Sequence, residues 1–409
     1  MQFFPIFVPN MKKVKVIAPT HLNGEITLPI SKSIASRVLI IKRLIHLFPS
    51  NTYRTLPPSP TLLDNYDNGC EDIRILTQAL NQVSTSINAE EMVIDTGSSG
   101  TAMRFMTAFL SLLHGNFILT GSDRMKERPI APLVEAMRKL GCKIDYLEQD
   151  GFPPLTINGG ISHSYTNSLS INASISSQFI SALLLIAPIL KNGLTLHLQG
   201  EIASKPYIDL TIDVMKRFGA RIDWTDMNTI SVAGSPYENC NFDIEGDWTA
   251  ASYWYEIMTL KPDSKIIVNN LNSHSIQGDA IVPELMNKIK IHHSNQPNQP
   301  FMFDFRNNPD LVQTAAATCF GLGMSYHFTG TDNLRYKETN RIAALNNELN
   351  KLRQGNYCIS TYNDHRMAMA FAPLALKFPY IIIENPEVVN KSYPTYWDDL
   401  YAVGFKISE

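Results

Sequence analysis

Short runs of small polar residues alternate along the chain with apolar segments long enough to form helices. Serine, threonine, asparagine and aspartate favour helix starts because their side chains accept a hydrogen bond from the first backbone N–H groups. Several apolar segments lead to strand-like runs that end in glycine, at 117–121, 194–200 and 326–330. The polar starts lie at 31–37, 97–104, 172–179, 245–251, 308–310 and 362–366. The pattern predicts one strand–helix–strand–helix–strand unit repeated six times.

The repeat is longer than those of common solenoids, which favours two domains of three units each over an extended horseshoe. Each predicted helix has a strongly apolar face, so we expect helices inside each domain with sheets around them. Parallel helices direct their N-termini to one surface, where aligned dipoles attract anions. The sequence therefore predicts an α/β fold with an anion site at the helix starts.

The stretch 331–341 is the strongest candidate for chemistry. It follows a strand-like run and leads into an amphipathic segment, so Lys337, Glu338 and Arg341 are expected near the first turn of a helix. Lys337 and Arg341 are four residues apart and would share a face. Two cations there oppose the helix dipole, which indicates an anionic ligand. Glu338 suits proton transfer, although a solvated charged turn fits the same residues.

Composition narrows the function classes. The 409 residues carry a net charge of -3, with 44% hydrophobic and 18% charged residues, which is ordinary for a globular enzyme and gives no basic field for nucleic acid. The five cysteines are scattered without zinc spacing, so we expect free thiols and no metal. We found no apolar run of membrane-spanning length, and expect a cytoplasmic protein. Residues 1–10 lack the features of a signal peptide and are interpreted as an upstream extension before Met11.

Eight motifs give the chain a resemblance to the enolpyruvyl transferases, over essentially its whole length from about residue 12. These motifs lie at 28–37, 97–104, 124–130, 176–179, 204–209, 245–247, 337–341 and 363–369. The resemblance implies a two-domain inside-out α/β barrel in which each domain has three βαβαββ repeats. Domain 1 would comprise 1–30 plus 245–409 and carry the catalytic carboxylates. Domain 2 would comprise 31–244 and bind shikimate 3-phosphate, with crossings near Ile30 and Ile244.

The resemblance also implies the reaction. The enolpyruvyl group of phosphoenolpyruvate would pass to the 5-hydroxyl of shikimate 3-phosphate by addition and elimination, releasing phosphate in a shikimate-pathway step without metal or organic cofactor. Asp310 is the candidate base for the hydroxyl, and Glu338 the candidate for proton exchange at the methylene carbon, assisted by Lys391 or Lys32. The two substrates are the expected partners, with no nucleic acid, no membrane and a monomeric chain.

The resemblance assigns the remaining site residues to the two substrates. The expected shikimate 3-phosphate set is Lys32, Ser33, Arg37, Ser176, Ser177, Gln178, Ser204, Asp310, Asn333 and Lys337. The expected phosphoenolpyruvate set is Lys32, Ser98, Gly100, Arg128, Gln178, Arg341, Arg366 and Lys391. Arginine suits both sets because its planar fork meets a carboxylate or phosphate with two hydrogen bonds. Glycine at position 100 lets the backbone approach a ligand closely.

Structural roles compete with these assignments. Asp310 taken alone fits the N-cap of the following helix better than a base, and Ser176 and Ser177 also fit helix caps. Arg104 is interpreted as a structural partner, and Asp364 and His365 as residues that brace Arg366. Asp247 is given no chemical step.

Some residues depart from the family pattern, and two rival functions stay open. Ser98 stands where most relatives have Asn, Ile30 replaces a usual Gly, and Phe105 replaces a usual Pro; Gly100 still implies binding of the inhibitor glyphosate. The sister transferase acting on UDP-N-acetylglucosamine carries a loop cysteine, which this chain lacks between 121 and 132. A non-catalytic phosphometabolite-binding protein would keep the cations but need neither Asp310 nor Glu338.

Overall fold

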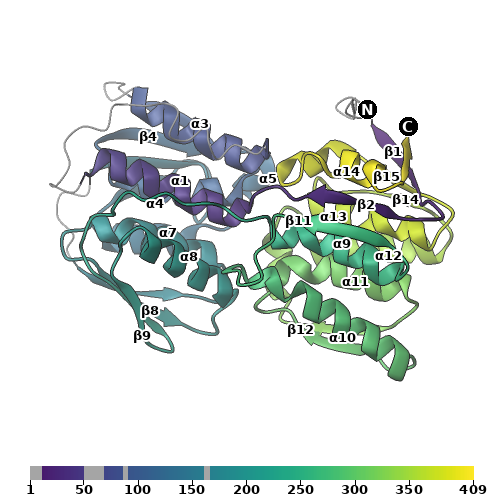
Figure 1. Cartoon of the computed structure of the whole chain (residues 1–409). Helices are drawn as coiled ribbons and strands as arrows, with labels where there is room; N and C mark the ends of the chain where they lie inside the picture. Colours follow the sequence, from purple (N-terminus) through teal and green to yellow (C-terminus); the bar gives the residue numbers. More distant parts are fainter. Residues whose placement is uncertain (1–11, 50–68, 86–90, 161–165) are drawn as a thin grey trace. The chain divides into compact units, whose positions relative to one another are not determined.

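The computed structural model describes residues 12–49, 69–85, 91–160 and 166–409 (Figure 1). The interpretation of residues 1–10 as an extension lies outside the described residues. The chain divides into two compact units. Unit 1 comprises the described parts of Met1–Ser31, Gly69–Glu71 and Glu245–Glu409, and unit 2 those of Lys32–Asn68 and Asp72–Ile244. The short segment Gly69–Glu71, which groups with unit 1, has no counterpart in the predicted domain boundaries.

Unit 2 contains two copies of one βαβαββ arrangement. In the first copy, strands β3 and β4 run parallel, and β6 and β5 continue the sheet antiparallel in the order β3-β4-β6-β5. The second copy repeats the same directions in the order β7-β8-β10-β9. The first copy comprises β3 (Met92–Asp95), α4 (Gly100–Ser111), β4 (Gly115–Thr120), α5 (Asp123–Lys126), α6 (Ala131–Lys139), β5 (Lys143–Tyr146) and β6 (Leu155–Gly159). The second comprises β7 (Ser168–Asn172), α7 (Ser177–Ile186), η1 (Ala187–Ile189), β8 (Leu194–Gln199), α8 (Lys205–Arg217), β9 (Ile222–Asp226) and β10 (Thr229–Val232).

The helices of unit 2 lie inside, as their apolar sequences predict. Helix α4 is buried at every residue except Thr101, and α7 at every residue except Gln178. A helix that is apolar on all sides is stable only when neighbours cover all of its faces. Helices α1 (Lys32–Leu47), α4 and α7 contact one another, and α3 (Glu71–Thr85) completes the described helices of this unit.

Unit 1 repeats the scheme with two strands supplied from the start of the chain. Its four-stranded sheet has the order β14-β15-β1-β16, with a parallel pair followed by two antiparallel partners, as in unit 2. Two further pairs, β2 with β11 and β12 with β13, are parallel. The strands are β1 (Lys13–Ile17), β2 (Asn23–Thr27), β11 (Lys265–Asn269), β12 (Phe301–Asp304), β13 (Tyr326–Thr329), β14 (Cys358–Ile359), β15 (Ile381–Glu384) and β16 (Lys406–Ser408).

Helices α9, α11 and α13 form the interior of unit 1. Helix α11 contacts both others, and every residue of α13 is buried. The helices are α9 (Trp248–Leu260), α10 (Val282–Asn295), α11 (Val312–Gly321), α12 (Arg341–Arg353), α13 (His365–Phe371) and α14 (Tyr396–Ala402). Short 3-10 turns are η2 (Gly278–Ile281), η3 (Pro309–Leu311), η4 (Asp332–Tyr336), η5 (Ala372–Leu376) and η6 (Pro386–Lys391). The predicted α/β class, with helices inside and sheets outside, is confirmed in each unit.

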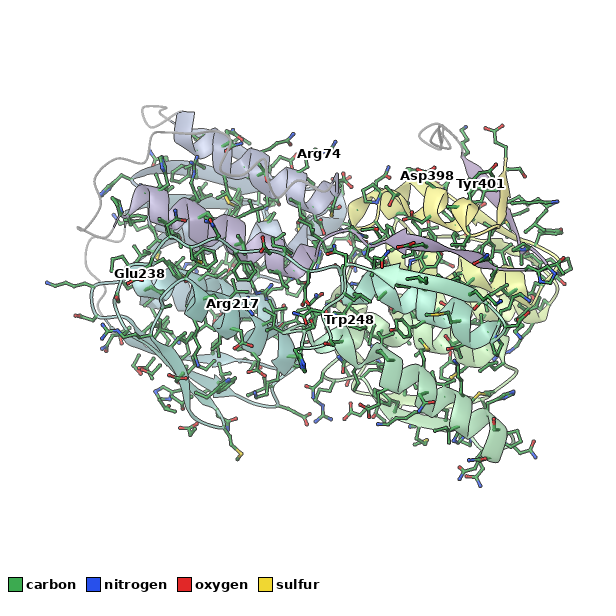
Figure 2. The ribbon with its side chains drawn as sticks, viewed as in Figure 1. Arg74, Arg217, Glu238, Trp248, Asp398 and Tyr401 are labelled. Atoms are coloured by element: carbon green, nitrogen blue, oxygen red, sulfur yellow. The ribbon has the colours of Figure 1, made fainter. Side chains whose placement is uncertain are left out.

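All six predicted helix starts are confirmed at α1, α4, α7, α9, α11 and α13. Asp247 caps α9 by accepting hydrogen bonds from the backbone N–H groups of Thr249 and Ala250. This is a structural role, consistent with leaving Asp247 out of the chemistry. Trp248, labelled in Figure 2, is the first residue of α9. Among the described residues, no helix is both long and apolar enough to cross a membrane.

Candidate functional site

A buried cluster in unit 1 is centred on Arg341, the first residue of α12. Its guanidinium contacts three carboxylates: Asp364 at 2.7 Å from Nε, Asp310 at 3.0 Å from Nη1 and Glu338 at 2.7 Å from Nη2. The side chain is only 2% exposed. Burial alone would lower the pKa of Arg341, but Asp364, Glu338 and Asp310 raise it above its usual value. The guanidinium therefore stays charged and fixes the carboxylates around it.

The carboxylate of Asp310 contacts three cations of this cluster. Its Oδ2 lies 2.8 Å from Arg366 Nη2, and its Oδ1 lies 3.9 Å from Lys337 Nζ, in addition to the contact with Arg341. Burial would raise the pKa of Asp310, but these three cations hold it well below its usual range. Leu311, not Asp310, occupies the N-cap position of α11. The alternative of Asp310 as a helix cap is therefore wrong.

Lys337 and Glu338 lie near the first turn of α12, as expected, but the expectation that Lys337 and Arg341 share a helix face is wrong. Asn340 caps α12 by accepting a hydrogen bond from Ala343 N, so the helix begins at Arg341 and Lys337 has extended backbone. Lys337 and Arg341 do not share a helix face, yet both reach Asp310. Glu338 Oε1 lies 3.3 Å from Lys391 Nζ, which is itself buried in η6. Asn333, in the preceding turn η4, has an Oδ1 that is buried without a hydrogen-bond partner among the described residues.

Asp364 organises the two arginines. It is fully buried, accepts from Arg341 Nε, and caps α13 by accepting from the backbone N–H of Arg366 at 3.0 Å. The predicted bracing of Arg366 by Asp364 is confirmed, and it extends to Arg341. His365 Nδ1 lies 3.6 Å from the same carboxylate.

Asp279 belongs beside this cluster, and no sequence motif indicated it. Its carboxylate accepts from Thr249 Oγ1 at 2.6 Å and from Asn308 Nδ2 at 3.3 Å, joining the starts of α9 and α11. Burial and the nearby charge of Asp310 raise the pKa of Asp279 to about 6. The only sequence signal is its position after Gly278 before an apolar helix, which many surface turns share.

Unit 2 carries a second cluster at the starts of α1, α4 and α7. Lys32, the first residue of α1, lies 2.7 Å from Asp72 Oδ2, a partner that sequence reasoning missed. Gln178 Nε2 donates to Thr101 Oγ1 at 3.2 Å, joining the starts of α7 and α4. Thr101 and Gln178 are the least buried residues of α4 and α7. The predicted convergence of helix starts is thus present within this unit.

Arg128 lies directly over the first residue of α4. A Cβ added to Gly100 would come within 2.6 Å of Arg128 Nη2 and 2.7 Å of Nη1. Arg104 flanks this contact by donating to the carbonyls of Gly100 and Pro129, which gives it the expected structural role. Ser98 lies two residues before Gly100 and is partly exposed. A side chain at position 100 would therefore displace the guanidinium of Arg128.

Arg37 has extensive protein partners in addition to its expected ligand. Its guanidinium donates to Thr211, Ser181 and the carbonyls of Ser33 and Tyr207, at 2.6–3.2 Å. Burial lowers the pKa of Arg37 to about 9. The side chain thus braces α1 against α7 and α8, a packing role that the sequence did not indicate.

The serines differ in their local roles. Ser176 caps α7 by accepting from Gln178 N at 3.2 Å, so the capping alternative is confirmed for Ser176. Ser177 is instead the first residue of that helix. Ser204 precedes α8 with a left-handed backbone, φ 57°. Among the described residues, no group of His, Cys, Asp and Glu is arranged to hold a metal ion, and all five cysteines are free thiols.

The fold and these clusters define a class: an α/β protein of two helix-cored units with buried lysines and arginines suited to small anions. A sequence family described as EPSP synthase (3-phosphoshikimate 1-carboxyvinyltransferase) matches residues 16–400. The chain belongs to this family.

Relatives and solved structures agree with that membership. The 3-phosphoshikimate 1-carboxyvinyltransferase of Bacteroides fragilis is 41% identical over 422 residues, covering 95% of this chain and 97% of the relative. The protein of the same name from a Shewanella species is 36% identical, covering 95% and 98%. The structure of EPSP synthase from Acinetobacter baumannii has a TM-score of 0.69 at 17% identity, covering 98% and 100%. The enolpyruvyl transferase NikO of Streptomyces tendae has a TM-score of 0.61 at 12% identity, covering 97% and 98%. At these identities the two structures support the fold alone.

Proposed function

We propose that this chain is a 3-phosphoshikimate 1-carboxyvinyltransferase. It transfers the enolpyruvyl group of phosphoenolpyruvate to the 5-hydroxyl of shikimate 3-phosphate and releases phosphate. The observation that carries the proposal is the buried cluster of unit 1, where Arg341 and Arg366 hold Asp310 while Arg341 and Lys391 hold Glu338. Family membership adds the identity of the substrates.

The cations are assigned to the groups that they match chemically. Phosphoenolpyruvate carries a carboxylate and a phosphate, which suit the planar forks of Arg128, Arg341 and Arg366. The full proposed set is Lys32, Ser98, Gly100, Arg128, Gln178, Arg341, Arg366 and Lys391. Support comes from the burial of Arg128, Arg341, Arg366 and Lys391, since a buried cation gains most from an anion that replaces its lost water.

Shikimate 3-phosphate combines one phosphate, one carboxylate and hydroxyl groups, so it suits serine hydroxyls and amides beside a few cations. The proposed set is Lys32, Ser33, Arg37, Ser176, Ser177, Gln178, Ser204, Asp310, Asn333 and Lys337. The buried unpartnered oxygen of Asn333 supports a hydroxyl ligand, because an acceptor without a partner is costly. The proposed role of Arg37 in this set is chiefly to hold the start of α1, with Lys32 and Ser33, in place.

Asp310 is the proposed base that takes the proton of the 5-hydroxyl. A useful base has a pKa near the working pH, whereas three cations hold the pKa of Asp310 far lower. Anionic substrates would draw Arg341, Arg366 and Lys337 into new ion pairs. Each lost partner raises the pKa of the carboxylate. We infer that substrate binding itself makes Asp310 basic enough to act.

Glu338 is the proposed acid and base at the methylene carbon, with Lys391 assisting. In the addition step, the hydroxyl oxygen bonds to the central carbon of phosphoenolpyruvate while the methylene carbon gains a proton and becomes a methyl group. In the elimination step, phosphate leaves and the methyl group returns one proton, restoring the double bond. Lys32 is the cation placed with both substrates, and it balances charge during these steps.

Phosphate release measured with both substrates tests the proposal. We expect turnover only when phosphoenolpyruvate and shikimate 3-phosphate are present together. Turnover with UDP-N-acetylglucosamine as acceptor would favour the sister transferase, and binding of both substrates without phosphate release would favour the non-catalytic protein. The monomeric state, the cytoplasmic location and glyphosate binding stay predictions.

A further inference from the structure

Two consecutive residues with left-handed backbone lie directly before the arginine-bearing helix α13. Tyr362 has φ 54° and Asn363 has φ 56°. This region favours glycine because the Cβ of other residues meets the neighbouring carbonyl. Such a conformation persists where surrounding contacts enforce it. Asp364 and Arg366 follow at once, so the directions of their side chains depend on this turn.

Glu348 of α12 holds the N-terminal side of the turn. Its Oε1 accepts from the hydroxyl of Tyr362 at 2.6 Å, and its Oε2 accepts from the backbone N–H of Ser360 at 3.1 Å. Lys351 Nζ, 2.8 Å from Oε1, balances the charge of this fully buried carboxylate. A buried carboxylate with so many partners fixes its neighbours firmly.

Helix α12 therefore binds the segment 360–366 at two points. Arg341 holds Asp364 at one point, and Glu348 holds Ser360 and Tyr362 at the other. Arg341 and Glu348 are seven positions apart, or about two helical turns. A helix is rigid over this length, so the spacing fixes the position of the turn and of Arg366 after it.

We propose that Tyr362 and Glu348 are a positioning pair for Arg366, in which the hydroxyl-to-carboxylate hydrogen bond keeps the turn in its left-handed form and directs Arg366 to Asp310. The inference rests on the proposed function, in which Arg366 binds phosphoenolpyruvate. Burial and the bond to Glu348 raise the pKa of Tyr362 to about 12. The hydroxyl therefore keeps its proton, and the bond, at neutral pH.

Tyr362→Phe tests the pair because it removes one hydroxyl and keeps the ring. We expect the KM for phosphoenolpyruvate to rise roughly five- to tenfold, the effect of losing about one hydrogen bond that orients Arg366. The KM for shikimate 3-phosphate should change less than about twofold, and Tm less than about 4 °C. Tyr357→Phe, which removes a hydroxyl nearby in the same unit, is the matched control and should leave both KM values unchanged.

Asn363→Gly added to Tyr362→Phe supplies a rescue. Glycine adopts the left-handed backbone without steric cost, so the double variant should regain most of the lost affinity for phosphoenolpyruvate. A purely structural role would lower Tm and would not change one KM selectively. The proposal is overturned if Tyr362→Phe leaves the KM for phosphoenolpyruvate within twofold, or raises both KM values equally.

A crystal structure of Tyr362→Phe gives a readout that does not depend on turnover. A shifted Arg366 that has lost its contact with Asp310 supports the pair, and an unmoved Arg366 overturns it. If the wild-type protein releases no phosphate, the proposed function fails while this comparison still decides the positioning role.

Discussion

The carboxyl groups of Asp310 and Asp279 have opposite electrostatic surroundings although they lie close together. Asp310 faces three cations that lower its pKa, while Asp279 faces the charge of Asp310 and is buried, so its pKa rises to about 6. Neighbouring carboxyl groups with separated pKa values commonly mark acid–base sites. Asn308, which lies two residues before Asp310 in the chain, donates a hydrogen bond to Asp279.

Asp279 makes the stability of the protein depend on pH. The folded pKa, about 6, lies above the unfolded value of 3.8. The stability that the protonated group contributes is complete below the unfolded pKa and is lost as pH rises through the folded pKa. Asp279→Asn removes this loss. Relative to wild type, the free energy of unfolding of the variant should therefore rise by roughly 1–1.5 kcal/mol between pH 5 and pH 7.5.

Urea unfolding of both proteins at the two pH values measures this difference. Asp145→Asn, at an exposed carboxylate, is the control and should show no such trend. A variant-to-wild-type difference that is the same at pH 5 and pH 7.5 would refute the assigned surroundings of Asp279.

At the scale of single residues, the sequence identified groups with a local or family motif and missed groups with a purely spatial role. Arg341, Arg366 and Asp310 belong to recognisable motifs, and the structure brings them together. Asp279 and Asp72 have no local signal that distinguishes them from ordinary carboxylates, because their importance arises from elements distant in the chain. The same reason explains why the packing role of Arg37 was missed: its partners lie on α7 and α8.

At the scale of elements, helix starts were predictable and one helix boundary was not. Small polar residues before an apolar run are a local signal, which all six inner helices follow. Lys337 was expected to share a helix face with Arg341 because Lys337 and Glu338 favour helices. The cap formed by Asn340 instead sets the start of α12 after them.

The start of α4 gives a prediction for Gly100→Ala. The added Cβ would displace the guanidinium of Arg128, so the KM for phosphoenolpyruvate should rise roughly tenfold or more, the effect of one lost charged hydrogen bond. Stability should not fall, since alanine favours a helix more than glycine. Steady-state kinetics and thermal melting check the two parts.

Gly24→Ala is the control for Gly100→Ala. Its Cβ would meet the side chain of Val403 at 3.1 Å, away from both clusters, and the KM for phosphoenolpyruvate should stay unchanged. An unaltered KM in Gly100→Ala would show that Arg128 is not needed for this substrate.

At the scale of the whole molecule, the repeat was predictable from the sequence, but the strand β1 that completes the four-stranded sheet of unit 1 was not. Six similar segments in sequence predicted six repeats. Among the described residues, three four-stranded sheets, two in unit 2 and one in unit 1, share one order of strand directions. Strand β1 completes the sheet of β14, β15 and β16 although it lies more than three hundred residues earlier. Pairing at that separation leaves no periodic signal, so the sequence alone could not assign it.

The proposal assigns the charged groups of the substrates to residues of both units. Clustered cations repel one another until anions neutralise them, so we predict that the protein becomes more compact when shikimate 3-phosphate binds. Small-angle scattering should show a smaller radius of gyration with shikimate 3-phosphate than without ligand. Shikimate without the phosphate is the control. Equal radii in all three conditions would contradict this prediction.

The most direct test of the account is phosphate release by wild type and Glu338→Gln with both substrates. The amide keeps the shape of the side chain but cannot exchange the proton, so kcat should fall by about 10²–10⁴-fold while the KM values stay within about threefold. Glu127→Gln, at an exposed carboxylate of unit 2, should match wild type. Wild-type turnover in Glu338→Gln, or no phosphate release by the wild-type protein, would contradict the central claim that the half-buried carboxylates held by Arg341, Arg366 and Lys391 carry out enolpyruvyl transfer.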